Sequence, residues 1–325
     1  MRVGVIGVGS MGQNHARVLA QKGVLGSVAD TCFEKAKSVG DRFSVEAYAN
    51  YKEALAGDLD AVVIATPTST HERIARYAIE EGKHVLLEKP MTGDSKVLRR
   101  LTSLAEKRSV VLSGGFIERY NPVVDYTRRS LDTGEYGDLI TASTRRVSTK
   151  SSRVTDIGVI LDLGVHDIDV LRYLVKTPVE SVYALGGSDG PKNHENHANI
   201  LLDFGDHITG FVEVNWLTPM KVRRFSLTCG KNYVEADYMD QSVVICSSSF
   251  KDSESQNLYD LPLESYLRKV SLKKEEPLMR EIKDFLAASE KGSTPLVTAE
   301  SAIETLQIAE AALESMRTGH KTRMR

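Results

Sequence analysis

The chain begins with MRVGVIGVGSMGQNHARVLAQKG (Met1–Gly23), in which a short apolar run leads directly into a glycine-rich turn and a helix-forming segment. In such a turn Gly7 lets the chain reverse, Gly9 lets phosphates approach the backbone, and Gly12 lets helix and strand pack closely. The free N–H groups and the positive dipole end of the helix then face an anion. The stretch predicts a strand–turn–helix unit that holds a dinucleotide pyrophosphate, with contacts from Gly7, Gly9, Ser10, Met11 and Gly12.

An acidic residue closes the next expected strand. Asp30 follows the run Val24–Ala29 and lies 23 residues after Gly7. A carboxylate in this position accepts hydrogen bonds from both ribose hydroxyls of NAD and repels the additional phosphate of NADP. The alternative is that Asp30 caps a helix over Cys32–Val39. We expect a dinucleotide site that prefers NAD.

The composition is that of an ordinary globular protein of two domains. The chain has 325 residues, of which 41% are hydrophobic and 26% charged, and its net charge is −2. This charge gives no global attraction to nucleic acid or anionic membranes, and no apolar run approaches the roughly 20 residues that span a bilayer. The N-terminus enters a strand directly, which leaves no room for a signal peptide. Three scattered cysteines fit a reducing compartment, so we expect a cytoplasmic protein with neither a nucleic-acid nor a membrane partner.

Short apolar strands and helical stretches alternate from residue 1 to residue 118. The further strands are expected at Ser44–Tyr48, Ala61–Ala65, His84–Leu87 and Val110–Ser113, and the helices between them near Tyr51–Ala56, Thr70–Glu81 and Ser95–Lys107. Several of these strands are apolar on both faces, which is typical of a parallel sheet covered by helices. The pattern predicts an α/β, doubly wound Rossmann domain over residues 1–118.

The pattern changes after Gly114-Gly115, and we expect a second domain over residues 119–325. Its predicted strands are Val179–Gly186, His197–Phe204, His207–Trp216, Arg223–Cys229, Tyr233–Asp237 and Val243–Cys246, and its predicted helices begin after Asn121-Pro122 and cover Val159–Val175, Pro277–Ser289 and Thr298–Met316. Successive strands with short turns indicate a large, mainly antiparallel open sheet in an α+β domain. Helices on one face would leave the other face free, so we expect a homodimer or homotetramer formed through this sheet.

Two candidate stretches follow strands of the first domain, where ligands bind in open α/β sheets. Thr66–His71 carries hydroxyl side chains that can contact the cofactor riboses, although Thr70 could simply cap the next helix. Cofactor contacts are expected from Thr66, Pro67, Thr68 and His71. The second stretch is Glu88-Lys89-Pro90, in which an ammonium near a hydroxyl carbon favours the alkoxide that develops as hydride leaves. The alternative for Glu88 and Lys89 is a surface ion pair with a neighbour.

A third candidate lies in the helical stretch after Val159. Spacing of four residues places Asp162 and His166 on one helical face. A histidine can accept an alcohol proton near neutral pH, and a nearby carboxylate can orient it; taken alone, such a pair is also common as a structural couple. His71 could join the two as a metal site, but H-x-x-x-H is absent, so no metal is expected.

Together, the glycine motif, Glu88-Lys89-Pro90 and the Asp162…His166 pair resemble the Gfo/Idh/MocA oxidoreductases, over nearly the whole chain. The resemblance implies that Lys89, Asp162 and His166 are catalytic and meet over the nicotinamide of NAD. His166 would accept the proton of a sugar hydroxyl. In one departure from the family, this chain has Asp156-Ile157-Gly158 where many members have a double glycine.

Within the family, the stretches Gly115–Val124, Arg153–Leu163 and Asn215–Pro219 resemble those of prokaryotic UDP-N-acetylglucosamine 3-dehydrogenases. A nucleotide sugar would give a role to nearby basic residues, which can bind a diphosphate but could equally be solvated surface charges: Arg119, Arg153, Lys221 and Arg223. The resemblance implies cofactor contacts also from Glu88, Lys89 and Asn121. The expected substrate contacts are Lys89, Arg119, Asn121, Arg153, Asp162, His166, Trp216 and Arg223.

The expected activity is NAD-dependent oxidation of a sugar secondary alcohol, at carbon 3 of UDP-N-acetylglucosamine. One alternative is a family member that acts on inositol, a free aldose or a nucleotide-linked uronic acid. Another is a regulator that binds NAD without turnover, against which the intact trio Lys89, Asp162 and His166 argues.

Overall fold

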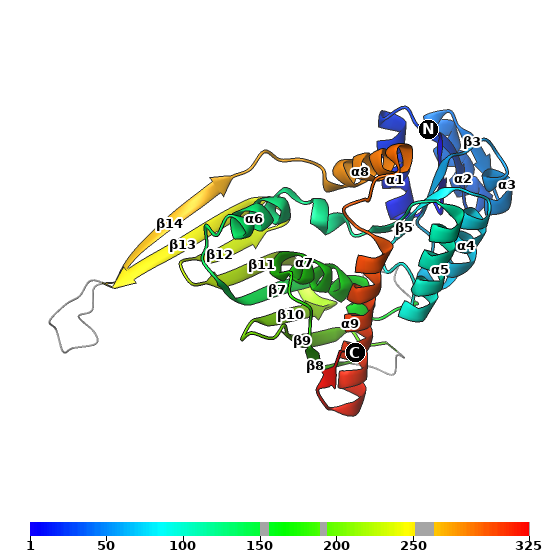
Figure 1. The fold of residues 1–325 in the computed structure, drawn as a ribbon. Coiled ribbons are helices and arrows are strands. Elements are labelled where there is room, and N and C mark those ends of the chain that lie inside the picture. The colour runs from blue at the N-terminus through cyan, green and yellow to red at the C-terminus, as the bar shows by residue number, and fades with distance from the viewer. Residues whose placement is uncertain (150–155, 189–193, 251–262, 325) are drawn as a thin grey trace. The chain divides into compact units, whose positions relative to one another are not determined.

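The computed structural model describes residues 1–149, 156–188, 194–250 and 263–324. The chain forms two compact units, each of which is built from separate segments (Figure 1). Unit 1 comprises Met1–Tyr120, residues 156–165 and Glu275–Glu310. Unit 2 comprises the described parts of Asn121–Ser151, His166–Lys274 and Ala311–Arg325.

Unit 1 contains a parallel sheet with the strand order β3-β2-β1-β4-β5-β6. The strands are β1 (Val3–Ile6), β2 (Leu25–Ala29), β3 (Glu46–Tyr48), β4 (Ala61–Ile64), β5 (His84–Glu88) and β6 (Leu112–Gly115). This doubly wound order confirms the predicted Rossmann fold. All residues of β1 and β4 are buried, as their apolar sequences require in a sheet covered on both faces.

Helices cover both faces of this sheet. They are α1 (Ser10–Gln21), α2 (Phe33–Phe43), α3 (Tyr51–Leu55), α4 (His71–Glu80), α5 (Ser95–Arg108) and α8 (Pro277–Lys291). The core on the α1 side includes Val3 and Val5 of β1, Leu19 of α1, and Ile282 and Phe285 of α8. Figure 1 shows α8 beside α1, and α4 beside α5.

The position of α8 differs from the predicted domain division. The predicted first boundary, at residue 118, lies two residues before the end of the first segment of unit 1, but the expected second domain included everything that follows. Residues 275–310 instead belong to unit 1. The reason is that the apolar face of α8 completes the core of the N-terminal sheet.

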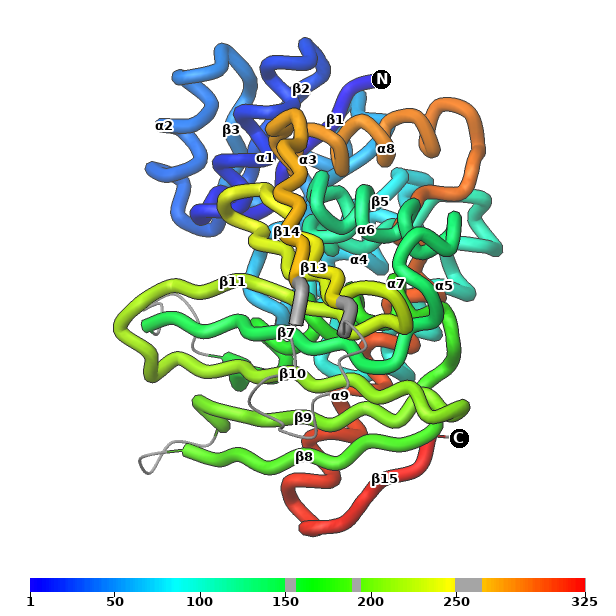
Figure 2. The backbone as a smooth tube through the Cα atoms, turned by 90° about the vertical axis from the view of Figure 1, so that its left-hand side faces the viewer, coloured from blue at the N-terminus to red at the C-terminus, as the bar shows by residue number. Residues whose placement is uncertain are grey.

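Unit 2 contains a mixed sheet with the strand order β14-β13-β12-β11-β7-β10-β9-β8-β15, of which Figure 2 shows β11, β7, β10, β9 and β8 side by side. The strands are β7 (Leu139–Thr149), β8 (Ser181–Gly187), β9 (His197–Asp203), β10 (Thr209–Asn215), β11 (Leu217–Cys229), β12 (Tyr233–Asp237), β13 (Ser242–Phe250), β14 (Leu263–Ser271) and β15 (Thr322–Arg323). Only β10 and β7 pair in parallel among these described strands. The predicted large, mainly antiparallel sheet is therefore confirmed, although β7, β14 and β15 were not among the predicted strands.

One face of this sheet packs on helices and the other is exposed. Leu171 of α7 (Val165–Val175) reaches the position of Gly210 on β10, and Ser315 of α9 (Ala299–Thr318) accepts a hydrogen bond from the backbone of Ala184 at 2.9 Å. Figure 1 shows α6 (Pro122–Asp132) and α7 on the same side of the sheet. The opposite face exposes apolar side chains, namely Leu185, Leu201 and Phe211. None of the described helices is both long and apolar enough to cross a membrane.

Candidate active site

The glycine turn of unit 1 has the geometry that a phosphate-binding turn needs. Gly7 adopts φ +88°, which a side chain would strain. A Cβ on Gly12 would lie 1.8 Å from the Gly7 carbonyl oxygen, whereas a Cβ on Gly9 would meet no described atom within 4 Å. Because α1 begins at Ser10, its free N–H groups face the open side of the turn at Gly9.

Asp30 is tied to this turn. One carboxylate oxygen accepts from Val8 N at 2.9 Å, and the other accepts from Cys32 N at 2.9 Å. The second bond resembles the capping interaction that was the alternative for Asp30, but α2 itself begins at Phe33. The two bonds fix the carboxylate at the carboxyl end of β2, beside the glycine turn.

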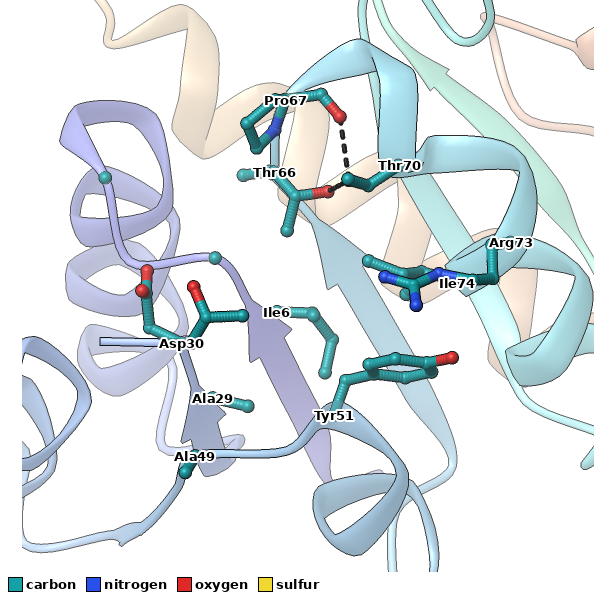
Figure 3. A pocket seen from close by; sticks show the side chains of 14 residues that line it. Ile6, Ala29, Asp30, Ala49, Tyr51, Thr66, Pro67, Thr70, Arg73 and Ile74 are labelled. Carbon is teal, nitrogen blue, oxygen red and sulfur yellow. Dashed lines mark hydrogen bonds between the residues drawn. The ribbon is translucent and has the colours of Figure 1, made fainter. Parts of the chain in front are cut away.

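A cavity of about 370 Å³ lies along this edge of the sheet (Figure 3). Its lining includes the predicted Gly7, Gly9, Asp30, Thr66 and Pro67. The Thr70 hydroxyl lies 2.8 Å from the Thr66 hydroxyl and 2.8 Å from the Pro67 carbonyl oxygen, which joins the loop after β4 to the start of α4. The volume falls in the range of small-molecule sites. An open glycine face at one end and a fixed carboxylate at the side fit the pyrophosphate and ribose of a dinucleotide.

Two further residues of this cavity were missed by the sequence reasoning. Tyr51 and Arg73 line it, and the Arg73 guanidinium lies 5.6 Å from the centre of the Tyr51 ring. Figure 3 shows both on the side of the cavity across from Asp30. The sequence could have indicated Tyr51, because this residue follows the expected strand Ser44–Tyr48 and therefore lies at the ligand-binding edge of the sheet. Arg73 lies within α4 and not directly after a strand, so its position in the sequence does not indicate a ligand contact.

His71 is buried, and both nitrogens of its ring lie within hydrogen-bond distance of backbone carbonyl oxygens. Nε2 lies 2.8 Å from the Thr66 carbonyl oxygen, and Nδ1 lies 3.1 Å from the Pro90 and 3.2 Å from the Met91 carbonyl oxygens. Burial lowers the pKa of His71 from its ordinary value, against the opposing effect of the backbone carbonyl groups around its ring. His71 thus joins the loops that follow β4 and β5. Its predicted contact with the cofactor stays a prediction.

The structure brings Lys89 and Asp162 together within unit 1. The Lys89 ammonium donates to the carboxylate of Asp162 at 2.9 Å and to its carbonyl oxygen at 2.7 Å. Both side chains are mostly buried, at 16% and 15% exposure, so this is not the surface ion pair of the alternative interpretation. Asp162 lies in a π-helical segment, Ile160–Gly164, rather than in the regular helix that was expected. Such segments are frequent at functional sites.

The Glu88 side chain turns inward, and one carboxylate oxygen lies 2.7 Å from Nε2 of the buried His15. The carboxylate is therefore held within the fold of unit 1.

His166 is buried at the start of α7, in unit 2. It follows Asp162 by four residues in a continuous helical stretch. The adjacent Asp167 is fully buried and binds Arg146 of β7 through two bonds, of 2.9 and 3.1 Å. This pair anchors the beginning of α7 to the sheet of unit 2.

The other residues that were predicted to contact the substrate lie in several elements of both units. Arg119 is buried and donates to the Leu296 carbonyl oxygen at 3.3 Å and to the Ser301 hydroxyl at 2.5 Å. Asn121 caps α6 and donates to the Tyr238 carbonyl oxygen at 3.2 Å. Trp216 is buried between β10 and β11, and Arg223 is half-buried on β11. Arg153 lies outside the described residues, and the substrate contacts of this group stay predictions.

No group of three or more histidine, cysteine or acidic side chains in the described part of the chain is placed to hold a metal ion.

A doubly wound unit with this glycine turn, an acid at the end of β2 and a lysine after β5 defines the class of dinucleotide-binding oxidoreductases. Residues 1–116 match the family model described as an oxidoreductase family with an NAD-binding Rossmann fold. Residues 124–235 match the GFO/IDH/MocA C-terminal domain, and the two matches together cover more than half of the chain. The protein belongs to the Gfo/Idh/MocA family of oxidoreductases, whose named relatives are sugar and polyol dehydrogenases, and its cofactor is NAD.

Three comparisons show the range of relatives. UDP-N-acetylglucosamine 3-dehydrogenase of Acidithiobacillus ferrooxidans is 37% identical over 186 residues, which are 57% of this chain and 58% of that enzyme. Its crystal structure superposes with a TM-score of 0.86 at 27% identity, covering 98% of both chains. The scyllo-inositol 2-dehydrogenase (NAD+) of Bacillus subtilis is 26% identical over 335 residues, which are 98% of this chain and 95% of that enzyme.

Proposed function

We propose that this protein uses NAD to oxidise the 3-hydroxyl of UDP-N-acetylglucosamine to the 3-keto sugar. The observation that carries the proposal is the contact between Lys89 and Asp162 just beyond the carboxyl end of β5. An ammonium has three N–H donors, and the bonds to Asp162 use two of them. We assign the third, which has no partner among the described residues, to a hydroxyl group of the sugar.

Each of the three catalytic residues has a distinct role in this proposal. His166 accepts the proton of the sugar hydroxyl, a role that an imidazole side chain can perform as a general base. Lys89 donates its remaining N–H to the same oxygen and stabilises the alkoxide as it forms. Asp162 holds the Lys89 ammonium in place through two hydrogen bonds, and we extend its role to orienting His166 on the following helical turn. Bound NAD supplies the acceptor for the hydride.

The nucleotide part of the substrate is supported by similarity and by charge. The relative with 37% identity is named for UDP-N-acetylglucosamine, although the alignment covers 58% of that enzyme. Lys221 and Arg223 on β11 are the cations that we assign to the diphosphate, together with Arg153. Arg119 donates to Leu296 before α9 and to Ser301 in the first turn of α9, and it contributes less to this assignment.

We further propose that the protein works in the cytoplasm as a homodimer or homotetramer. The exposed face of the unit 2 sheet carries Leu185, Leu201 and Phe211, which are 57%, 50% and 37% exposed. Burial of such a patch against a second copy removes apolar surface from water at about 25 cal/mol per Å².

A second candidate function is dehydrogenation of a free polyol. The alignment with the scyllo-inositol dehydrogenase spans 98% of this chain and favours it. A free polyol has no diphosphate, so reversing the charge of Arg153 would leave that activity intact and abolish activity on a nucleotide sugar.

The test is NADH formation, followed by absorbance, with a panel of UDP-N-acetylglucosamine, its uronic acid, inositol and glucose. Each assay includes a hydrazine trap, because oxidation to a ketone can be unfavourable at equilibrium. Turnover confined to UDP-N-acetylglucosamine supports the proposal, and turnover of a free polyol contradicts its substrate. NAD binding without turnover of any member contradicts the proposed substrate and favours a regulator or an untested sugar.

A further inference from the structure

A buried polar cluster lies beneath the end of β5, and the proposed function makes no use of it. His15 of α1 is fully buried, and Glu88 is 7% exposed. His15 Nε2 lies 2.7 Å from one carboxylate oxygen of Glu88. An imidazole and a carboxylate enclosed in an apolar core are costly to place there unless they bind each other.

The same carboxylate also contacts the backbone of Lys89. Its second oxygen accepts a hydrogen bond from Lys89 N at 3.2 Å. One carboxylate oxygen of Glu88 thus contacts His15, and the other accepts from the backbone nitrogen of Lys89. Rotation of the carboxylate after loss of His15 would remove the bond to Lys89 N, and Lys89 would lose one of the contacts that set its position.

A second buried carboxyl group, Glu281 of α8, interacts with this cluster, and its pKa shifts in the direction opposite to that of Glu88. Burial acts to raise the pKa of Glu88, but the hydrogen bond and charge of His15 and the charge of Lys89 outweigh it and hold that pKa below its ordinary value. Burial, followed by the charges of Glu88 and Asp284, raises the pKa of Glu281 well above its ordinary value.

The pKa of Glu281 is thus raised while that of Glu88 is lowered, so Glu88 is the one of the two carboxyl groups that favours its charged form.

We propose that His15 is a positioning residue for Lys89, acting through Glu88 to hold the ammonium where it meets the sugar hydroxyl. The proposal rests on the role proposed above for Lys89. It gives the helix of the glycine turn a second role. The N-terminus of α1 faces the cofactor phosphates, and a side chain from within the same helix supports the reacting end of the site from the core.

The test compares two polar variants that differ by one methylene group. In His15→Gln the amide nitrogen takes the place of Nε2 and can donate to Glu88. In His15→Asn the amide nitrogen lies near the place of Nδ1 and cannot reach that carboxylate. Both variants keep a polar side chain at the position, and circular dichroism at the assay temperature establishes that each is folded.

Three quantities are measured: kcat, the Kd of NADH by fluorescence titration, and the rate at which a pulse of acetic anhydride labels Lys89, read by peptide mass spectrometry. We expect His15→Asn to lower kcat by roughly 10- to 100-fold, with an NADH Kd close to wild type and an altered labelling rate. His15→Gln should restore both kcat and the labelling rate to near wild type.

Equal behaviour of the two variants would overturn the proposal, as would an unchanged Lys89 labelling rate in His15→Asn. A loss of NADH affinity as large as the loss of kcat would show that His15 only shapes the cofactor turn. The matched control is Ser27→Ala, which removes another buried polar atom of unit 1, and it should leave all three quantities unchanged.

The labelling measurement needs no substrate. It therefore decides the role of His15 even if none of the tested sugars turns over, in which case only the proposed function would fail.

Discussion

His166 is the residue on which the proposed chemistry depends most directly. Replacing His166 by Asn keeps a polar group of similar size but removes the base. We expect kcat to fall by roughly 10²- to 10⁴-fold, while the Kd of NADH changes little, because the cofactor cavity of unit 1 does not include this residue. His320→Asn, at an exposed position near the end of the chain, serves as control. Equal losses in kcat and in NADH binding would remove His166 from the catalytic role.

Asp30 is expected to decide between the two nicotinamide cofactors. Replacing Asp30 by Ser removes the charge that repels the 2′-phosphate and the acceptor for the ribose hydroxyls. The affinity for NAD should fall, and its advantage over NADP should shrink by about tenfold or more, which corresponds to about 1.4 kcal/mol. Titration with NADH and NADPH measures both changes. Asp94→Asn, at the N-cap of α5, is a control in the same unit, and an unchanged selectivity ratio would exclude the role of Asp30.

For single residues, the sequence predicted the position of a side chain or glycine well where a motif fixes the local geometry. Gly7, Gly12 and Asp30 lie in the arrangement that their spacing implied. It gave no indication of the partners of a long side chain that lie far away in the sequence. Arg119 donates to Leu296 and Ser301, which lie nearly two hundred positions later, and its substrate contact stays a prediction. No local pattern encodes such a contact.

Alanine substitutions at two glycines of the turn between β1 and α1 should have different effects on stability and on cofactor binding. A Cβ on Gly12 would lie 1.8 Å from the Gly7 carbonyl oxygen, whereas a Cβ on Gly9 has open space among the described residues. Gly12→Ala should therefore destabilise the fold, by roughly 1–3 kcal/mol or more. Gly9→Ala should keep the melting temperature and lose NADH affinity, because its methyl group occupies the phosphate side of the turn. Thermal unfolding and NADH titration of both variants give the comparison, and equal stability of the two would contradict it.

The buried Glu281 of α8 should make the stability of the protein depend on pH. Because burial and nearby charge raise the pKa of Glu281, the folded state keeps a proton that the unfolded chain releases above about pH 4.5. Wild-type stability should therefore fall relative to Glu281→Gln as pH rises above that value, by up to about 1.4 kcal/mol per pH unit. Urea denaturation of both proteins from pH 5 to pH 8 measures the difference. Parallel curves would contradict it, and Ser289→Ala on the same helix should run parallel to wild type.

Prediction of whole elements failed at β7 for a physical reason. Its inward positions include Thr144 and Arg146, of which Arg146 is only 1% exposed. The apolar alternation that identifies a strand is hidden, because Asp167 neutralises Arg146 inside the core. Strands with aliphatic inward positions, such as β9 and β10, were predicted to within a few residues.

The assembly of the whole molecule depends on the exposed face of the unit 2 sheet. Leu201 and Phe211 pair directly across β9 and β10 on this face. Replacing both by Asp should shift sedimentation velocity profiles from oligomer to monomer, while leaving each unit folded. Met239→Lys, at an exposed turn of the same unit, is the control. A wild-type protein that sediments as a monomer, or a double variant that stays oligomeric, would exclude this interface.

The late position of α8 in the chain has a consequence during protein synthesis. Strands β1 to β6 leave the ribosome early, but Leu278, Ile282 and Phe285, which complete their core, follow about 170 residues later. At about 5–20 residues per second this is a delay of roughly 10 to 30 s, in which apolar surface of α1 and β1 is open to chaperones. A nascent chain stalled at Tyr120 would carry every strand of its sheet and still lack part of its core.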